Sequence, residues 1–129
     1  MTHRKKLMIV EDSMTQANAV AAHLSSEVDV IIASDGTQAL RIVRIELPDL
    51  IILDVNLPKL NGIQVCQRLK RDFETAHIPI IMLTAATNAQ QKEDGMNAGA
   101  DHYIYKGERA TAQLLMIIRQ YKLIDEFVS

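Results

Sequence analysis

Short apolar runs alternate with longer amphipathic stretches along the whole chain. The stretches between the runs repeat apolar residues three or four positions apart, which is the spacing of one face of a helix. This alternation is typical of βα units and predicts five strands, each followed by a helix. The apolar runs, taken in order, are Leu7–Val10, Val28–Ala33, Leu50–Leu53, Ile78–Leu83 and Tyr103–Tyr105.

Capping and breaking residues mark the ends of the predicted helices. Ser13 and Gln16 fit a capping box at the start of the first helix. The second helix is predicted from about Thr37 to Leu47, because Pro48 stops it. The other three helices carry an apolar face at Val65, Cys66, Leu69 and Phe73, a weaker and more polar one within Ala89–Ala98 that Gly99 ends, and a long one at Leu114, Ile117, Ile118 and Tyr121.

Unbroken apolar runs indicate which strands lie in the middle of the sheet, because such strands are buried on both faces. The first, third and fourth runs are unbroken, whereas Asp29 interrupts the second and the fifth is short. With right-handed crossovers, a doubly wound, flavodoxin-like order 2-1-3-4-5 puts the second and fifth strands at the edges. The sequence therefore predicts an α/β fold with a five-stranded parallel sheet, helices on both faces, and a ligand site at the carboxyl ends of the first and third strands.

Length and composition predict one domain and restrict its partners. The 129 residues fit a single domain, 1–129, with an ordered core over about 5–127. The 14 Lys and Arg against 16 Asp and Glu give a net charge of -2, from which we expect no direct contact with nucleic acid and none with a membrane. Cys66 has no partner for a disulfide, and no apolar segment is long enough for a signal sequence or a membrane span. We therefore expect a cytoplasmic protein.

Polar residues follow four of the predicted strands at one edge of the sheet. Any one of them would be common there as a helix cap or turn former. Together they bring three carboxylates and one ammonium group to one crevice, where the carboxylates repel one another unless a cation is present. These residues are Glu11 and Asp12 after the first strand, Asp54 after the third, Thr84 after the fourth and Lys106 after the fifth.

The chemistry that fits this set is phosphoryl transfer to a carboxylate. Oxygen ligands of this kind suit Mg²⁺, which takes one or two carboxylates and prefers a phosphate as a further partner. Asp54 lies where a carboxylate could attack phosphorus and form an aspartyl phosphate. The metal, the ammonium group of Lys106 and the hydroxyl of Thr84 would then neutralise the phosphoryl oxygens in a loose transition state.

Five short motifs resemble those of the receiver domains of bacterial two-component response regulators. They are Glu11-Asp12-Ser13, Asp54 with Asn56-Leu57-Pro58 and Asn61-Gly62, Thr84-Ala85-Ala86, Gly99-Ala100-Asp101, and Lys106. The resemblance extends from about Lys5 to Phe127, and the motifs come in the right order at the right strand ends. Any one of them alone is weak, but the set is highly specific to receiver domains, and we expect one of the single-domain type.

The resemblance implies a role for each of these residues. Asp54 accepts a phosphoryl group from a histidine kinase or a phosphotransfer protein, and Thr84 and Lys106 bind the phosphoryl oxygens. Tyr103 is the aromatic residue whose rotamer follows Thr84 in the switch, so the surface of the fourth helix, fifth strand and fifth helix changes for a downstream protein partner. The implied ligands of Mg²⁺ are Glu11, Asp12, Asp54 and the backbone carbonyl of Asn56.

One departure from the family concerns the residue after the lysine. Family members usually have proline there, often in a cis peptide, whereas this chain has Gly107. Glycine allows the same turn but does not lock it. The sequence therefore leaves open what holds Lys106 in place.

The interpretation that we favour is a signalling domain in a phosphorelay, without an output domain of its own on this chain. It is not an enzyme beyond accepting its phosphoryl group and losing it slowly. An aspartate-nucleophile phosphatase is the enzyme alternative, but Asn56 cannot serve as the general acid that a DxD motif provides. A flavin-binding module shares the strand order of flavodoxin, but Glu11 and Asp12 have the wrong charge for a phosphate loop. The last alternative is a degenerate receiver that only binds proteins, against which the complete set of strand-end residues argues.

Overall fold

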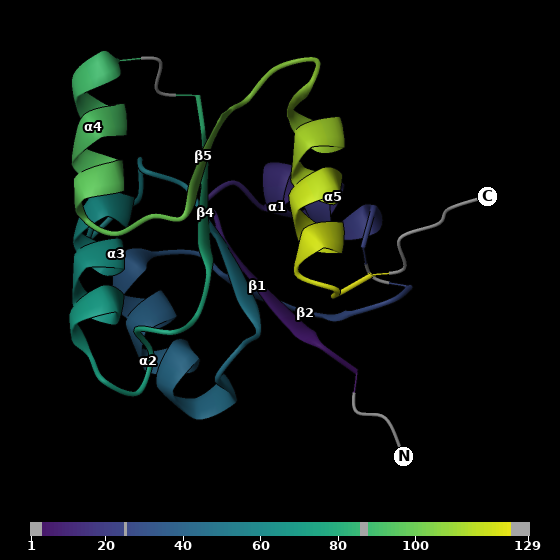
Figure 1. Cartoon of the computed structure of the whole chain (residues 1–129), viewed down its shortest axis with the longest axis horizontal. Helices are drawn as coiled ribbons and strands as arrows, with labels where there is room; N and C mark the ends of the chain where they lie inside the picture. The colour runs from purple at the N-terminus through teal and green to yellow at the C-terminus, as the bar shows by residue number, and fades with distance from the viewer. Residues whose placement is uncertain (1–3, 25, 86–87, 125–129) are drawn as a thin grey trace.

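The structure, a computed structural model, describes residues 4–24, 26–85 and 88–124 and is built on one sheet. Its strands are β1 (Lys6–Val10), β2 (Asp29–Ala33), β3 (Leu50–Leu53), β4 (Ile80–Thr84) and β5 (His102–Tyr105). They are all parallel and lie in the order β2-β1-β3-β4-β5 (Figure 1). This confirms the predicted fold, with the interrupted and the short apolar runs at the two edges.

Helices cover both faces of this sheet. On one face lie α1 (Met14–Ala22) and α5 (Ala110–Gln120), and on the other lie α2 (Gly36–Glu46), α3 (Gly62–Arg71) and α4 (Ala89–Asn97) (Figure 1). Within the described parts of the chain, no helix is long and apolar enough to cross a membrane.

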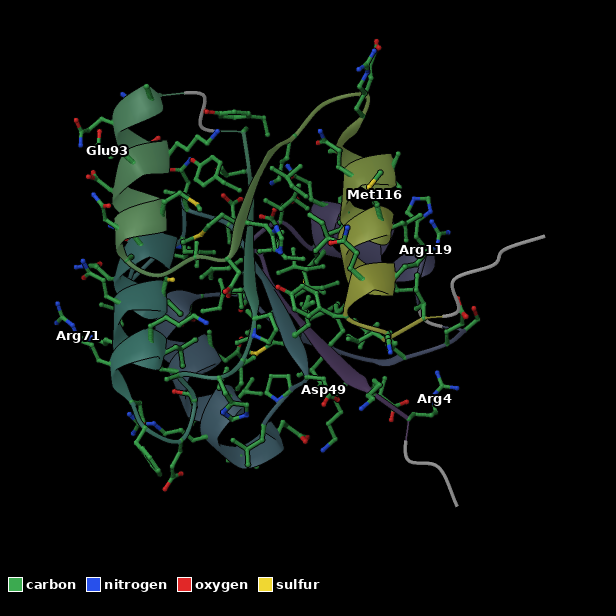
Figure 2. The ribbon with its side chains drawn as sticks, viewed as in Figure 1. Arg4, Asp49, Arg71, Glu93, Met116 and Arg119 are labelled. Carbon is green, nitrogen blue, oxygen red and sulfur yellow. The ribbon has the colours of Figure 1, made fainter. Side chains whose placement is uncertain are left out.

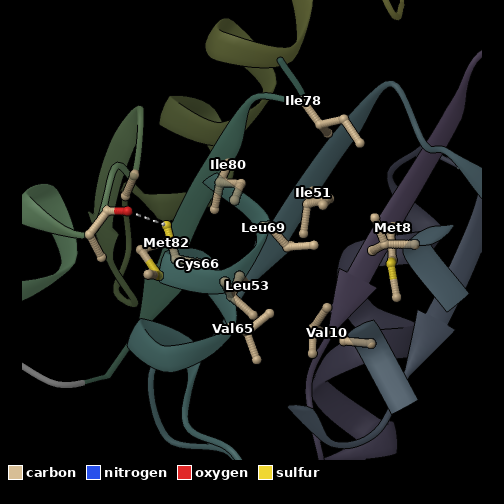
Figure 3. Packing of buried hydrophobic residues seen from close by; sticks show 14 of the residues in the cluster. Met8, Val10, Ile51, Leu53, Val65, Cys66, Leu69, Ile78, Ile80 and Met82 are labelled. Carbon is tan, nitrogen blue, oxygen red and sulfur yellow. Dashed lines mark hydrogen bonds between the residues drawn. The ribbon is translucent and has the colours of Figure 1, made fainter. Parts of the chain in front are cut away.

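Each face of the sheet has its own hydrophobic core, because side chains alternate between the two faces along a strand. Every residue of β3 and β4 is buried, whereas β2 is fully buried only at Ala33. Figure 3 shows the core under α3, which packs on the sheet through Val65, Cys66 and Leu69. A largely aliphatic core thus forms on both sides of the central strands.

Cys66 is a core residue, as its place on the apolar face of the third helix predicts. It is fully buried, and its Sγ lies 3.7 Å from the carbonyl oxygen of Ala98 (Figure 3). Burial raises the pKa of the Cys66 thiol to about 11. The thiol therefore stays protonated at neutral pH and has no electrostatic activation as a nucleophile.

Local signals end the helices largely where the sequence predicts. The side-chain oxygens of Ser13 and Asn61 accept backbone N–H groups at the starts of α1 and α3. Leu47 ends α2 in the left-handed region with φ 45°, directly before Pro48. Gly99, with φ 108°, follows the cap of α4 in the conformation that glycine favours.

Phe73 differs from its prediction as a core residue of the third helix. It is 95% exposed. The helix ends at Arg71, and Asp72 is extended with φ −85° and ψ 123°, so Phe73 no longer follows the spacing of Leu69. Thr75 closes this end of the helix instead, because its hydroxyl donates to the carbonyl oxygen of Leu69 at 2.7 Å. The prediction for Phe73 is wrong because helical spacing does not continue past Asp72.

Candidate functional site

The carboxyl ends of β1, β3, β4 and β5 bring most of the predicted site residues to one edge of the sheet. Glu11 and Asp54 follow the last paired residues of β1 and β3, so they start from neighbouring positions. Thr84 ends β4, and Lys106 follows β5 directly. The N–H of Lys106 donates to the carbonyl oxygen of Thr84 at 2.9 Å, which joins these two strand ends. Ala86, the last residue of the Thr84 motif, lies outside the described residues.

The ammonium group of Lys106 lies between two buried carboxylates. Its Nζ is 2.6 Å from Oε1 of Glu11 and 3.0 Å from Oδ2 of Asp54. The side chains of Glu11 and Asp54 are 8% and 9% exposed, and that of Lys106 is 25% exposed. A third oxygen, Oε1 of Gln16 in α1, accepts from the same Nζ at 2.5 Å. Three acceptors therefore match the three hydrogens of the ammonium group.

Burial and pairing together set the protonation of this cluster. Burial raises the pKa of Glu11, and the hydrogen bonds from Lys106 and from the backbone of Ser13 offset only part of that effect. Burial alone would favour the neutral amine of Lys106, but its hydrogen bonds to Glu11 and Asp54 outweigh burial and raise its pKa. Lys106 is therefore positively charged at neutral pH and lets the two carboxylates lie close together.

Backbone contacts hold the carboxylate of Asp54 in one orientation. Its Oδ1 accepts the N–H of Asn56 at 3.1 Å, which leaves Oδ2 for Lys106. Its own N–H donates to the carbonyl oxygen of Val10 at 3.1 Å. Helix α3 begins against this strand end, where a Cβ at Gly62 would clash with the carbonyl oxygen of Asp54. Glycine therefore permits the close approach of α3 to Asp54.

The structure gathers two of the three predicted carboxylates. Asp12 is exposed at the surface next to Glu11 in the chain. Among the described residues, no group of three or more Asp, Glu, His or Cys side chains is close enough to hold a metal ion. The atoms at the site that could bind a metal ion are all oxygens. The two buried carboxylates share one positive charge, that of Lys106. Such a set fits a hard divalent cation, which would supply further positive charge between them.

Thr84 and Tyr103 lie on the same face of the sheet, and Tyr103 lies under α4. Thr84 is fully buried. It is level with Tyr105 in the register of β4 and β5, two residues beyond Tyr103, so the side chains of Thr84 and Tyr103 are diagonal neighbours. The ring of Tyr103 lies against Gly95 of α4, where a Cβ would be 3.3 Å from its Cε2. Burial raises the pKa of the Tyr103 hydroxyl.

Gln16 belongs to the cluster although the sequence predicts a different role for it. The predicted capping box forms by half: Oγ of Ser13 accepts the N–H of Gln16 at 3.3 Å, but the N–H of Ser13 donates to Oε2 of Glu11 at 3.1 Å. In α3, Asn61 and Gln64 complete both halves of such a box. No local sequence signal separates the two glutamines, because only the fold brings α1 to the end of β5.

The chain is similar in sequence to known receiver domains. The family model described as "Response regulator receiver domain" matches residues 7–119. The DNA-binding response regulator MtrA of Mycobacterium tuberculosis (strain ATCC 25618 / H37Rv) is 42% identical over 106 residues, which are 81% of this chain and 45% of MtrA. The DNA-binding dual master transcriptional regulator RpaA of Synechocystis sp. is 41% identical over 125 residues, 94% of this chain and 52% of RpaA. The chain thus spans about half the length of these curated relatives.

Two crystal structures extend the similarity to the fold. The phosphorylated cyanobacterial phytochrome response regulator RcpA matches with a TM-score of 0.80 at 27% identity, covering 93% of this chain and 92% of that chain. The Mn²⁺-bound form of response regulator Rcp1 matches with a TM-score of 0.81 at 25% identity, covering 97% and 99%. The shared feature is therefore the whole sheet with its helices and not a single motif.

These relatives contradict the prediction of no direct contact with nucleic acid. MtrA and RpaA are both DNA-binding regulators. The prediction rests on the net charge of this chain, which is -2. That charge includes only the residues of this chain. Since the matches cover only about half of each relative, the net charge of this chain does not report on DNA binding by those relatives.

Proposed function

Because the chain belongs to the response regulator receiver domains of two-component signal transduction, we propose that Asp54 is its phosphoacceptor. The donor is a phosphohistidine of a histidine kinase or of a phosphotransfer protein. A carboxylate oxygen of Asp54 attacks phosphorus, so an O–P bond forms and the N–P bond of the phosphohistidine breaks. The electron pair of that bond stays on the imidazole nitrogen. The product is an aspartyl phosphate on a regulator, not the turnover of a classical enzyme.

The observation that carries this proposal is the pairing of Asp54 with Lys106. The carboxylate is almost buried, is oriented by Asn56, and lies 3.0 Å from a firmly charged ammonium group. Such a group can pass from the carboxylate to the phosphoryl oxygens as negative charge develops on them. Thr84, buried at the end of β4, is the proposed hydroxyl partner. The similar response regulator RcpA was crystallised in a phosphorylated form, which supports the proposal that this chain is phosphorylated.

Mg²⁺ is the cofactor in this proposal. The residues proposed to hold it are Glu11, Asp12, Asp54 and the backbone carbonyl of Asn56. When bound, it would neutralise charge on the phosphoryl oxygens. Burial raises the pKa of Glu11, and this supports a cation site, because a cation there would favour the charged carboxylate. The Mn²⁺-bound form of the similar Rcp1 also supports it.

The output in this proposal is a change in the surface formed by α4, β5 and α5, called here the α4–β5–α5 surface. Thr84 would follow the new phosphoryl oxygens, and Tyr103 would turn into the space that it leaves. A partner that binds one state better than the other then reads the signal. The DNA-binding relatives MtrA and RpaA support transcriptional control as the regulated process.

Intact-mass measurement with a small phosphodonor tests the central step. Acetyl phosphate with Mg²⁺ should add one phosphoryl group to the protein, and the mass should return to its starting value after the donor is removed. Asp54→Asn should take up none, because the carboxylate proposed to attack phosphorus is then replaced by an amide, and Glu11 remains only as a partner of Lys106. Glu93→Gln, which removes an exposed carboxylate on α4 (Figure 2), should be modified as the wild type is.

Two results would contradict the proposal. A mass gain that persists in Asp54→Asn would place the phosphoryl group elsewhere. A gain of equal rate in excess chelator would remove the proposed role of Mg²⁺.

A further inference from the structure

We infer that Gln16 is a positioning residue for Lys106. The side-chain amide oxygen of Gln16 holds the ammonium group of Lys106 at the phosphoacceptor site while Glu11 and Asp54 exchange that group for the metal or the phosphoryl group. The inference rests on the proposed function and deepens it. It assigns the positioning of the Lys106 side chain to a residue of α1, because Gly107, the next residue in the chain, does not fix it.

The packing around Lys106 does not fix its side chain. Gly107 is exposed, and a Cβ built on it would meet no heavy atom within 4 Å. On the side of α1 and α5, Lys106 borders a cavity of about 300 Å³ that Leu24, Leu83 and Leu114 help to line. Toward the site it borders a smaller cavity of about 20 Å³. Hydrogen bonds, and not packing, must therefore define the position of its ammonium group.

The three acceptors of this ammonium group differ in what the proposed reaction does to them. Glu11 and Asp54 are carboxylates that the metal would use, and Asp54 also becomes the phosphorylated residue. Gln16 is a neutral amide and takes part in neither event. Its bond of 2.5 Å to Nζ is thus the contact that can persist when Lys106 moves from carboxylate to phosphoryl oxygens.

Gln16 is available for this task because of how α1 begins. Its side chain would ordinarily reach back to the N–H of Ser13, as Gln64 does to Asn61 in α3. Here Oε2 of Glu11 takes that N–H at 3.1 Å. The backbone of Gln16 is still fixed by Oγ of Ser13 at 3.3 Å. The same carboxylate that pairs with Lys106 therefore frees the glutamine that also binds it.

Three variants test the inference through the rate of phosphorylation by acetyl phosphate at saturating Mg²⁺. Gln16→Leu keeps the size of the side chain but removes the acceptor, and should slow the reaction by about tenfold. Gln16→Glu keeps an acceptor oxygen at the same position and should stay within about twofold of the wild type. Asn18→Leu, which removes an exposed amide elsewhere on the same helix, should leave the rate unchanged.

A double-mutant cycle separates positioning from a general structural effect. In a Lys106→Met background, Gln16→Leu should have no further effect on the remaining slow reaction, because the group that it positions is gone. A second measurement needs no reaction: in Mg²⁺-free protein, the two ε-methylene protons of Lys106 should have separate shifts in the wild type and in Gln16→Glu. They should merge in Gln16→Leu, where the ammonium group is free to move.

The outcomes distinguish this inference from the proposed function. Uptake at the wild-type rate by Gln16→Leu, or equal slowing in the wild-type and Lys106→Met backgrounds, overturns the positioning role and leaves Asp54 as phosphoacceptor. A wild-type protein that takes up no phosphoryl group overturns the proposed function, and this inference with it.

Discussion

Lys106 partly neutralises Glu11 and Asp54, as a divalent cation there would also do, and this creates competition at the site. The ammonium group is within 3.0 Å of both carboxylates. Mg²⁺ therefore adds its charge to a site that is already partly compensated. Binding of the proposed Mg²⁺ would therefore change which cation each carboxylate faces.

Replacing Lys106 should make this competition visible. In Mg²⁺-free buffer, Lys106→Met should lower the free energy of unfolding by about 2 kcal/mol, because two buried carboxylates lose their partner. The loss stays below that of a fully buried pair, since the Lys106 side chain is 25% exposed. Mg²⁺ binds the folded state, so it should raise the melting temperature more in this variant than in the wild type.

Thermal melts with and without Mg²⁺ check this, with Lys5→Met as a control that removes an exposed lysine far from the site. Equal Mg²⁺-induced shifts in Lys106→Met and in the wild type would mean that the ammonium group and the metal do not compete.

The sequence predicts the charged residues of the site but not all of its contacts. Glu11, Asp54 and Lys106 follow apolar runs, and a parallel sheet necessarily collects such residues at one edge. The contact between Gln16 and Lys106, which are 90 residues apart in the chain, depends on the relative placement of α1 and the end of β5. The local pattern around Gln16 describes a capping box, and nothing in it shows that Glu11 takes over half of that box.

At the scale of whole elements, α4 is the helix least fixed by apolar packing. Gly95 is its one buried residue, and it lies against Tyr103 of β5. Glycine in a helix interior costs about 1 kcal/mol relative to alanine. Gly95 therefore lowers the intrinsic stability of α4, and its missing side chain leaves space for the ring of Tyr103, the proposed switch residue.

Adding a methyl group at this position should couple the helix to the ring. In Gly95→Ala, the new Cβ would lie 3.3 Å from Cε2 of Tyr103, so the ring must shift by a few tenths of an ångström. The expected result is a changed chemical shift of the Tyr103 ring and slower amide exchange in α4, measured by NMR. The gain in α4 should be smaller than about 1 kcal/mol, because displacing the ring offsets part of the propensity.

The control is the same substitution in Tyr103→Leu, where the ring is absent and the full gain in helix stability should appear. An identical gain in both backgrounds, with unmoved ring signals, would show that Gly95 and Tyr103 are not coupled.

The elements themselves follow from the sequence more closely than their ends do. Unbroken apolar runs correctly separate the central strands from the edges, because burial on both faces leaves no room for polar side chains. The strand β4 begins at Ile80 although its apolar run begins at Ile78, since Pro79 has no N–H for the sheet. Phe73 shows the same limit in a helix, where periodicity continues beyond the residue at which the backbone turns away.

At the scale of the molecule, the two layers of helices divide the tasks. The layer of α1 and α5 supplies Gln16 near the site, and the layer of α2, α3 and α4 covers the face of the sheet that carries Tyr103. Figure 2 shows Glu93 of α4 and Met116 of α5 on the outside, where both are exposed. The α4–β5–α5 surface therefore offers charged and apolar contacts to a partner, over elements next to the proposed switch.

Charge summed over the whole chain does not predict what that partner is. The balanced charge argues against nucleic acid, yet the relatives MtrA and RpaA bind DNA. In a regulator that acts through a change of shape, the receiver needs a surface that differs between two states, and it needs no basic patch of its own.

Phosphorylation should therefore change the α4–β5–α5 surface, and amide exchange can test this across the whole molecule. Beryllofluoride with Mg²⁺, as a mimic of the phosphoryl group on Asp54, should alter exchange both in the loops around Asp54 and over residues 89–124. The helix α4 should respond most, because its one buried residue is Gly95, and we therefore expect its local stability to be low. In Thr84→Ala the loops should still respond, but the change over residues 89–124 should be lost, because no hydroxyl transmits the new charge to Tyr103. Thr15→Ala, which removes an exposed hydroxyl on α1, should behave as the wild type does. If the changes stay confined to the loops around Asp54 in every protein, the switch through Thr84 and Tyr103 is wrong, while the phosphorylation chemistry at Asp54 is unaffected.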